Sequence, residues 1–228
     1  MSWAIVERYR RTLAAEGGAV TRNWGGKLTV CLVYPHHYRT AMSNLGFQTV
    51  YALLNGYPDV VCERAFLPDA EEEREYAKSA TPLLSLESQR PLSDFDLIAF
   101  SVSFESDYLH IPAIFARAHL PPLAVDRSAT HPLVVAGGAA LFLNPEPVAE
   151  LLDLVCVGEA EELLPQLLGL LRREGGTERA ELLQEAAGLP GIYVPSAYRV
   201  TFDGARLVSR EREAWAPEKV TRAWAAEL

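Results

Sequence analysis

Two adjacent histidines, His36 and His37, are side chains of a type that can bind a ligand or a metal ion. They lie in the polar segment 35–46 (PHHYRTAMSNLG), between an apolar run and a helical pattern. A loop in that position can present backbone N–H groups to an anion or an amide. Adjacent histidines rarely bind one ion together, and no third Cys, His or carboxylate follows at metal-ligand spacing. The pair therefore indicates a polar loop or a ligand contact rather than a metal site.

A second group of polar side chains follows another apolar run. Ser101 and Ser103 alternate with apolar residues there, and Ser106 or Asp107 could cap the helix that comes next. Polar side chains at the end of a buried strand need hydrogen-bond partners. The phosphate, ribose or amide of a ligand would provide them, so the two serines are candidate binding residues.

Glycines follow two further apolar runs, as Gly137-Gly138 and as Gly158-Glu159. The pair Gly137-Gly138 fits either a tight turn alone or a flat ligand group that approaches the backbone closely. Neither GxGxxG nor GxxxxGKS/T occurs, which argues against an ordinary dinucleotide or nucleoside triphosphate site. We assign no residue as an acid, a base or a nucleophile.

The elements that must position these loops are continuous apolar runs, which are typical of parallel strands covered on both faces. Strands are expected at residues 28–34, 97–103, 133–136 and 154–157, and a more mixed run at 60–66 fits an edge strand. Helical patterns separate them, at residues 41–54, 107–119 and 159–173. The pattern of 41–54 places Met42, Leu45, Thr49 and Leu53 on one helix face.

Strands that alternate with helices predict right-handed crossovers and an open α/β fold with a doubly wound parallel sheet. Five strands favour the order 2-1-3-4-5 of flavodoxin-like folds. In such sheets ligands bind beyond the carboxyl ends of the strands, near the switch point between the first and third. The candidate residues above all follow strands, so they are expected at this edge.

Composition restricts the class of protein. A chain of 228 residues can form one main domain, and its net charge of −9 argues against nucleic acid as a direct partner. No signal peptide and no apolar run of membrane-spanning length occurs, so we expect a cytoplasmic protein with no membrane contact. The three cysteines, at positions 31, 62 and 156, each lie in an apolar run and are expected to be buried rather than paired or metal-bound.

The ends of the chain differ from its middle. Residues 1–23 are expected to form a helical lead-in, and residues 24–176 the Rossmann-like domain. Residues 177–228 form a small C-terminal extension, with a short helix at 178–187 and a β-hairpin of 198–202 and 205–208 around Asp203-Gly204. After Ser209 the charged tail shows no strand pattern and is expected to lead out of the domain. The acidic stretch 68–78 indicates a solvated helix face.

Four segments together resemble a family of radical S-adenosylmethionine (SAM) proteins whose N-terminal half resembles a cobalamin-binding domain. They are residues 35–55, 62–69 (CERAFLPD), 83–108 and 133–164. The most specific part is LVVAGG…NPEP…VGEAEELL, in which a strand followed by Gly-Gly precedes a strand followed by Gly-Glu-x-Glu. The resemblance extends from about residue 24 to residue 173.

The resemblance implies a cobalamin-binding-type domain whose strand ends would cradle the nucleotide tail of cobalamin. Ser101 and Ser103 would contact the dimethylbenzimidazole region, Gly137 and Gly138 would pass beneath it, and loop 35–46 would face the corrin. The residues implied to contact the cofactor are His36, His37, Tyr38, Ser43, Gly46, Ser101, Ser103, Phe104, Glu105, Gly137, Gly138, Ala139, Gly158 and Glu159.

The resemblance also implies a catalytic half that this chain lacks. That half holds a [4Fe–4S] cluster through CxxxCxxC and uses S-adenosylmethionine, and no such motif occurs here. The chain also departs from the DxHxxG motif that supplies an axial histidine in some cobalamin domains. The leading hypothesis is a non-catalytic module that positions a corrinoid or an unknown substrate for a C-terminal radical SAM domain, with methyl or methylthio transfer as the reaction. The alternatives are a degenerate docking or sensing domain without cobalamin and a stand-alone flavodoxin-like enzyme.

Overall fold

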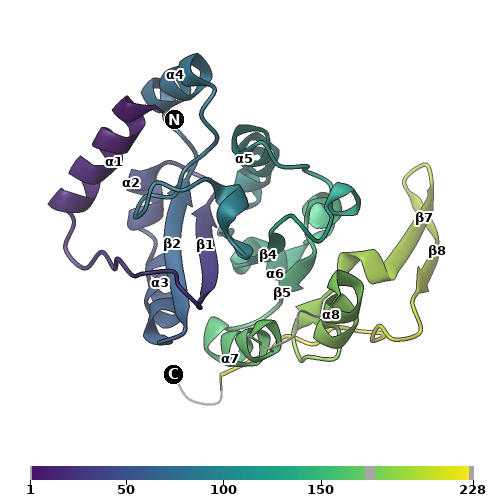
Figure 1. Cartoon of the computed structure of the whole chain (residues 1–228). Helices are drawn as coiled ribbons and strands as arrows, with labels where there is room; N and C mark the ends of the chain where they lie inside the picture. Colours follow the sequence, from purple (N-terminus) through teal and green to yellow (C-terminus); the bar gives the residue numbers. More distant parts are fainter. Residues whose placement is uncertain (1, 173–177, 226–228) are drawn as a thin grey trace.

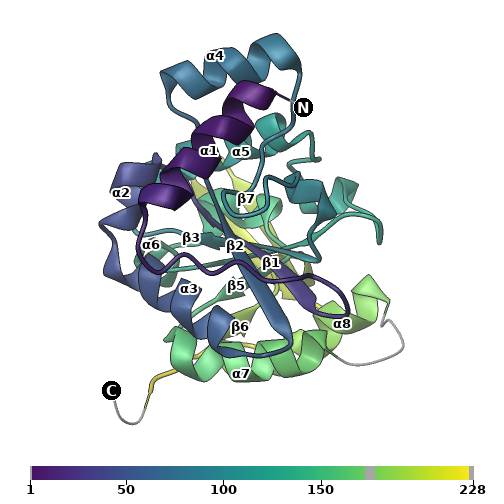
Figure 2. The same ribbon diagram turned by 60° about the vertical axis from the view of Figure 1, so that its left-hand side comes forward.

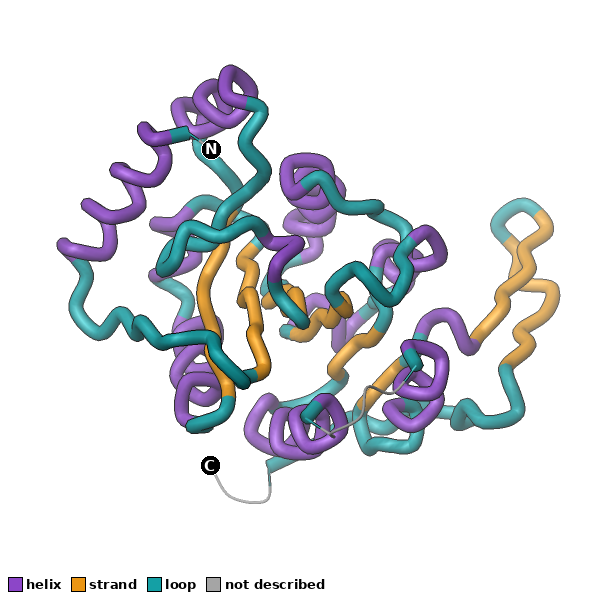
Figure 3. Tube along the Cα trace, in the orientation of Figure 1, coloured by secondary structure: helices purple, strands orange, loops and turns teal. Residues whose placement is uncertain are grey.

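The central element of the computed structural model, which describes residues 2–172 and 178–225, is a six-stranded sheet in the order β2-β1-β3-β4-β5-β6. Figure 3 draws the strands in orange. The strands are β1 (Leu28–Tyr34), β2 (Val60–Phe66), β3 (Leu97–Ser101), β4 (Leu133–Gly137), β5 (Leu154–Cys156) and β6 (Ile192–Tyr193). The first five are parallel, and β6 pairs with β5 in the antiparallel direction. The expected flavodoxin-like order of five strands is confirmed. The sixth strand has two residues, too few to show a pattern in the sequence.

Helices cover both faces of this sheet. On one face lie α3 (Leu45–Gly56) and α7 (Ala160–Leu171). On the other lies α5 (Ile111–Ala118), whose Phe115 ring packs on Phe100 of β3 at 5.6 Å between centroids. The remaining α-helices are α1 (Trp3–Ala15), α2 (Tyr38–Met42), α4 (Ala70–Ser79), α6 (Ala139–Leu143) and α8 (Arg179–Ala186). The 3₁₀ helices are Leu92–Asp94, Glu105–His110, Ala124–Asp126, Glu146–Leu151 and Pro195–Ala197.

The helix expected at residues 41–54 is in fact two helices. The chain leaves α2 at Ser43, and Asn44 then caps α3 by accepting the Phe47 N–H at 2.9 Å. The expected face is also wrong, because Leu45 is 79% exposed whereas the buried residues of α3 are Phe47, Tyr51, Leu54 and Asn55. The apolar residues of this helix point in more than one direction, so their spacing alone does not identify the face that meets the sheet.

Other boundaries shift by smaller amounts. The helix expected at 107–119 begins as the 3₁₀ turn Glu105–His110 and continues as α5, with Pro112 in its first turn as expected. The strand expected at 97–103 ends at Ser101. Arg173, the expected end of α7, and the expected domain boundary between residues 176 and 177 lie outside the described residues.

Strand β2 is an edge strand, as expected, yet every one of its residues is buried. The segment between α1 and β1 crosses it, as Figure 2 shows, and the Trp24 indole N–H donates to Glu63 at 2.7 Å. From the other direction, Leu86 N–H donates to the Arg64 carbonyl at 2.7 Å. The first contact joins two side chains and the second pairs a backbone carbonyl of β2, so the two segments together cover this edge.

The C-terminal extension forms a hairpin that projects from the body of the molecule (Figure 1). Its strands are β7 (Tyr198–Asp203) and β8 (Arg206–Arg212). The turn lies one residue later than expected, at Gly204-Ala205, and Gly204 adopts a positive φ of 60°. The expectation that strand structure ends near Ser209 is wrong, because β8 continues to Arg212 in register with Tyr198.

The expectations for the cysteines and for the acidic stretch are largely confirmed. Cys31 and Cys62 are fully buried, but Cys156 is only half-buried. The acidic stretch forms α4, whose Asp69 and Glu72 make a capping box and whose carboxylates pair with Arg8 of α1. Among the described residues, no helix is both long and apolar enough to cross a membrane.

Candidate functional site

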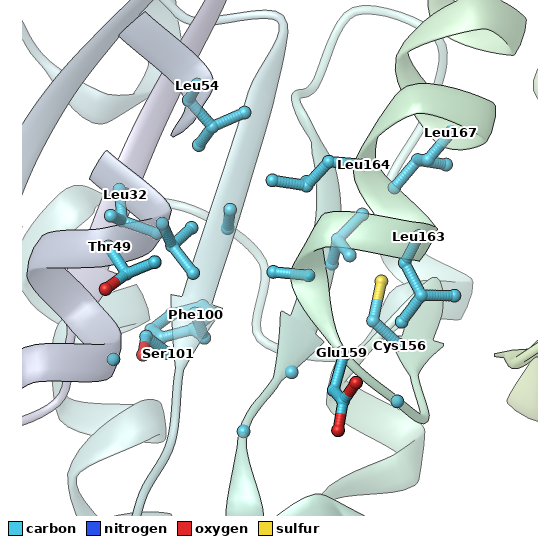
Figure 4. A pocket seen from close by; sticks show the side chains of 18 of the residues that line it. Leu32, Thr49, Leu54, Phe100, Ser101, Cys156, Glu159, Leu163, Leu164 and Leu167 are labelled. Atoms are coloured by element: carbon cyan, nitrogen blue, oxygen red, sulfur yellow. The ribbon is translucent and has the colours of Figure 1, made fainter. Parts of the chain in front are cut away.

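A cleft of about 410 Å³ opens on one face of the sheet, between α3 and α7 (Figure 4). We call it the α3–α7 cleft. Every second residue of the central strands forms its floor, because side chains on a strand alternate between the two faces. The floor residues are Val30, Leu32, Leu97, Ala99, Ser101, Val135, Gly137 and Cys156. The small residues Ala99 and Gly137 sit where larger side chains would fill the space, so they create the cleft.

The walls of the α3–α7 cleft are apolar over most of their length. Helix α3 contributes Val50 and Leu54, and α7 contributes Leu163, Leu164 and Leu167. In Figure 4 the leucines Leu54, Leu164 and Leu167 lie at one end of the cleft, and Ser101 and Glu159 lie towards the other. The cleft therefore has an apolar end, where Leu54 and Leu167 are almost fully buried, and a polar mouth at the carboxyl ends of the strands.

Asn44 organises the polar mouth. Its side-chain oxygen caps α3, and its Nδ2 donates to Ser103 Oγ at 3.0 Å. Ser101 and Thr49 also line the cleft, and within the described part of the chain their hydroxyls make no hydrogen bond. These two hydroxyls, one from β3 and one from α3, are free to bind a ligand.

Two of the candidate glycines are required by contacts within the chain. A Cβ on Gly138, whose φ is +119°, would lie 2.2 Å from the Val102 carbonyl oxygen. A Cβ on Gly158, at φ +149°, would lie 2.5 Å from the Ala223 carbonyl oxygen. The backbone of the protein itself therefore occupies the space left by these two missing side chains. Gly137 has ordinary contacts and only widens the cleft floor.

The C-terminal segment returns to the cleft mouth, contrary to the expectation that it leads out of the domain. Ala223 pairs with the end of β5, donating to the Val157 carbonyl at 3.0 Å and accepting the Glu159 N–H at 3.1 Å. The Arg222 guanidinium lies 4.8 Å from the Phe142 ring and 3.8 Å from the Trp224 ring. Arg222 and the Ala225 N–H, at 3.7 and 2.6 Å, both contact the Glu159 carboxylate. Glu159 therefore attaches this segment to α7.

Three histidines gather beyond the ends of β1 and β3. His36 Nδ1 accepts the His37 backbone N–H at 2.7 Å, so the proton of its neutral ring lies on Nε2. His37 and His110 instead direct Nδ1 at the carbonyl oxygens of Leu67 and Pro35, at 3.1 and 2.7 Å. A carbonyl only accepts, so in their neutral rings Nε2 carries the lone pair. Burial lowers the pKa of His36, which favours its neutral form.

Asp107 lies beside these histidines and is 3% exposed, yet its Oδ2 has no hydrogen-bond partner among the described residues. Burial raises its pKa, an effect that the charges of His36 and His110 only partly oppose. A buried carboxylate oxygen without a hydrogen-bond partner destabilises a fold, so Asp107 is a candidate functional residue. The described residues contain no group of three or more His, Cys, Asp or Glu side chains placed to hold a metal ion.

We expect Asp107→Asn to raise the melting temperature at pH 7, because it removes the charge of a buried carboxyl group whose Oδ2 has no hydrogen-bond partner among the described residues. A carboxyl group whose pKa is raised in the folded state destabilises the protein only at pH values above its ordinary pKa of 3.8. The gain in melting temperature should therefore vanish at pH 3. Thermal unfolding at the two pH values measures this. Asp126→Asn, at an exposed position of another 3₁₀ helix, is the control and should change neither value. An equal gain in melting temperature at both pH values would show that the charge of Asp107 is not what destabilises the protein.

The candidate residues thus fall into two groups. Those that line the α3–α7 cleft are Gly46, Ser101, Ser103, Gly137, Gly138, Ala139, Gly158 and Glu159. Those that do not line it are His36, His37, Tyr38, Ser43, Phe104 and Glu105. Tyr38 packs its ring on Phe66, and Ser43 donates to the Thr40 carbonyl, so both serve the local fold.

Several residues of the site were not expected from the sequence. They are Asn44, Thr49, Ala99, Phe142, Cys156 and His110. Ala99 had a usable signal, because a small residue in the middle of a run of large apolar residues leaves space on one sheet face. The contributions of Asn44 and His110 depend on contacts with distant segments, at Ser103 and Pro35.

A doubly wound α/β domain with a cleft at the carboxyl ends of its strands has the flavodoxin-like architecture, in which ligands commonly bind at that edge. Residues 46–195 match the model of a family described as radical SAM proteins, N-terminal. This match covers more than half of the chain. The chain belongs to this family, and its resemblance to radical SAM proteins is thereby confirmed. No curated protein and no solved structure matches the chain.

Proposed function

We propose that this domain holds a corrinoid at the carboxyl ends of its strands and presents it to a radical SAM catalytic domain. The observation that carries the proposal is the α3–α7 cleft, which lies beside the switch point between β1 and β3. Its size falls within the range of roughly 300–1,000 Å³ typical of small-molecule sites. Its apolar walls and polar mouth suit a nucleotide tail that ends in an aromatic base.

The polar groups of the mouth suit the sugar and phosphate of such a tail. The free hydroxyls of Ser101 and Thr49 can bind a ribose or a phosphate oxygen. Helix α3 begins here, and the first-turn N–H groups of a helix favour anions. The negative charge of Glu159 is offset by Arg222 at 3.7 Å. The residues present therefore fit the group.

The loops above the mouth suit the corrin ring. His37 and His110 each hold Nε2 as an acceptor, the form in which imidazole binds a metal. His36 presents an N–H instead, so it fits a hydrogen bond to a ring substituent. A bound corrinoid would supply a cobalt centre for methyl or methylthio transfer.

Exposed apolar side chains surround the same edge of the sheet. Leu45, Phe104, Leu109 and Leu143 follow β1, β3 and β4, and each is at least 60% exposed. Apolar residues gathered on one edge fit a surface covered by another domain or by a ligand. In our proposal that partner is a radical SAM domain of the same protein, which contains the [4Fe–4S] cluster and binds S-adenosylmethionine.

A second candidate is a docking or sensing domain with the same fold and no cobalamin. The specific observation in its favour is that Val102 and Ala223 occupy the spaces left by Gly138 and Gly158, so these glycines do not need a ligand to explain them. Against it, neither Phe104 nor Tyr108 fills the cleft, because Phe104 is 60% exposed and the Tyr108 hydroxyl donates to Asn144; Phe142 does line the cleft.

Binding of hydroxocobalamin tests the proposal. At protein concentrations well above micromolar, we expect corrin absorbance to remain with the protein after gel filtration. Ala99→Phe should lower the affinity by about tenfold or more, because the ring fills the cleft floor. Ala52→Phe, on the exposed side of α3, is the control and should bind normally. If the unaltered protein retains no corrin absorbance, the corrinoid proposal is wrong.

A further inference from the structure

The β7–β8 hairpin is a separate two-stranded sheet without a core of its own. Within the described residues its strands pair only with each other, and all of their residues except Tyr198 and Ser209 are exposed. Its large apolar side chains, which are 36–61% exposed, are Val200, Phe202, Leu207 and Val208. A two-stranded hairpin alone is only marginally stable in water, so this one needs a surface that covers it.

One face of the hairpin balances its own charges. Residues directly opposite each other in an antiparallel pair lie on the same face. Arg199 lies opposite Glu211, and Asp203 lies opposite Arg206, with Thr201 between the two pairs. Opposite charges across a ladder attract each other, so this face needs no charged partner.

The other face is apolar and carries positive charge without a counterion. We call it the hairpin docking face, and its residues are Tyr198, Val200, Phe202, Leu207, Arg210 and Arg212. The Arg210 guanidinium lies 5.1 Å from the Tyr198 ring, and Arg212 donates to the Ala216 carbonyl at 2.7 Å. Neither arginine pairs with a carboxylate among the described residues. A surface that covers this face should therefore offer both apolar atoms and carboxylates.

The distribution of charge along the chain favours a second copy as the partner. The hairpin holds four arginines against two acids, a net charge of +2, whereas the whole chain carries −9. Two hairpins therefore repel each other, but each hairpin is attracted to the acidic body of another copy. The complementary surface is expected outside the hairpin.

One exposed apolar residue of the body lies among carboxylates, as the docking face requires. Val125 is 86% exposed, and the exposed Asp126 follows it. The 3₁₀ helix Glu146–Leu151, which carries the exposed Glu150, packs against this turn. Arg127, the next residue along the chain, is buried and bonded to a carboxylate, so it adds no positive charge to this surface. We call Val125, Asp126 and Glu150 the Val125 patch.

The other exposed apolar side chains of the described body are less suitable. Trp3 and Trp224 each lie against an arginine that would repel the hairpin, Arg10 at 5.3 Å and Arg222 at 3.8 Å from the ring. The rest surround the edge of the sheet assigned above to the catalytic domain, and this step alone rests on the proposed function.

We propose that the chain forms a two-fold dimer in which the hairpin docking face of each copy packs on the Val125 patch of the other. The base of the hairpin, the 3₁₀ helix Pro195–Ala197, packs against the helix that carries Glu150. Hairpin and patch therefore lie side by side on each copy, and two-fold symmetry brings both contacts together at once. The hairpin projects from the body, which leaves it free to reach across (Figure 1).

Sedimentation velocity of the intact chain tests the dimer. We expect a dimer at about 50 µM protein in low salt, and an affinity lower by about tenfold or more in roughly 0.5 M NaCl, because salt screens the charge pairs. Arg210→Gln should weaken the dimer by about tenfold, whereas Arg199→Gln, on the face that balances its own charges, should leave it unchanged. A monomer under these conditions would overturn the proposal, and so would equal effects of the two substitutions.

A charge exchange tests the Val125 patch. Glu150→Arg and Arg210→Glu should each weaken the dimer, and the variant that combines them should recover most of the lost affinity. If the combined variant is weaker than either single variant, the hairpin does not meet this patch and the proposal is wrong. Corrinoid binding is measured separately, so loss of the dimer proposal leaves the proposed function intact.

Discussion

Replacement of Arg64 by alanine is expected to lower the free energy of unfolding by about 3–5 kcal/mol, because it leaves two buried carboxylates without their counterion. Arg64 is 1% exposed. Its guanidinium bonds to Glu87 at 2.6 Å and to Glu16 at 2.5 and 2.7 Å, and it lies 4.5 Å from the Tyr51 ring. Burial already raises the pKa of Glu87 against the opposing charge of Arg64. Without Arg64 the pKa of Glu87 rises further, so the loss of unfolding free energy caused by the substitution should become smaller as the pH falls.

Urea unfolding at pH 7 and at pH 5 measures both effects. The control is Arg8→Ala, which removes a partly exposed arginine that also pairs with carboxylates, those of Asp69, Glu71 and Glu72. Exposed pairs of this kind contribute about 0–1 kcal/mol. If the two substitutions destabilise the protein equally, the Arg64 network does not hold the N-terminal segment against β2.

Gly138→Ala is expected to destabilise the domain by about 3–5 kcal/mol. The added Cβ would meet three backbone atoms of Val102, the nearest at 2.2 Å, and the φ of +119° disfavours any residue with a side chain. Backbone atoms cannot move aside as a side chain does, so either the loop after β4 or the end of β3 must shift.

The neighbouring Gly137→Ala serves as the control for this prediction. Gly137 has no positive φ, and its Cβ would lie at ordinary contact distance from Cys156, 3.4 Å from the Cβ atom. We expect this substitution to change stability by less than about 1 kcal/mol. Chemical unfolding of the two variants compares them directly. Similar losses for both would show that the close approach of Gly138 to Val102 is unimportant for the fold.

The sheet could be predicted from the sequence because its information is local. Strands β1 and β2 end where their apolar runs end, and parallel topology then brings the loops after the strands to one edge. What could not be predicted depends on distant contacts. Asn44 ends one helix and begins another while bonding to Ser103, 59 residues away. Strand β6 exists only because Ile192 and Tyr193 meet β5.

The candidate site could be predicted in part for the same reason. The positions of Ser101, Gly137 and Gly158 follow from strand order alone. The floor and walls of the cleft do not, because they depend on which face of α3 meets the sheet. The amphipathic pattern assigned Thr49 to the apolar face, whereas Thr49 lines the cleft. The cleft lining and the core are built from the same types of apolar residue. A sequence pattern therefore cannot distinguish a residue that lines the cleft from one that packs in the core.

The covered edge of β2 has a consequence for how copies of this domain meet. An open edge strand can pair with a strand of another molecule and so extend a sheet between chains. Here two other segments of the chain cover that edge, because Trp24 bonds to the Glu63 side chain and the Leu86 N–H donates to the Arg64 carbonyl. Loss of the Arg64 network would release the N-terminal segment and uncover the strand. Variants that weaken this covering should therefore aggregate through sheet extension before their core unfolds.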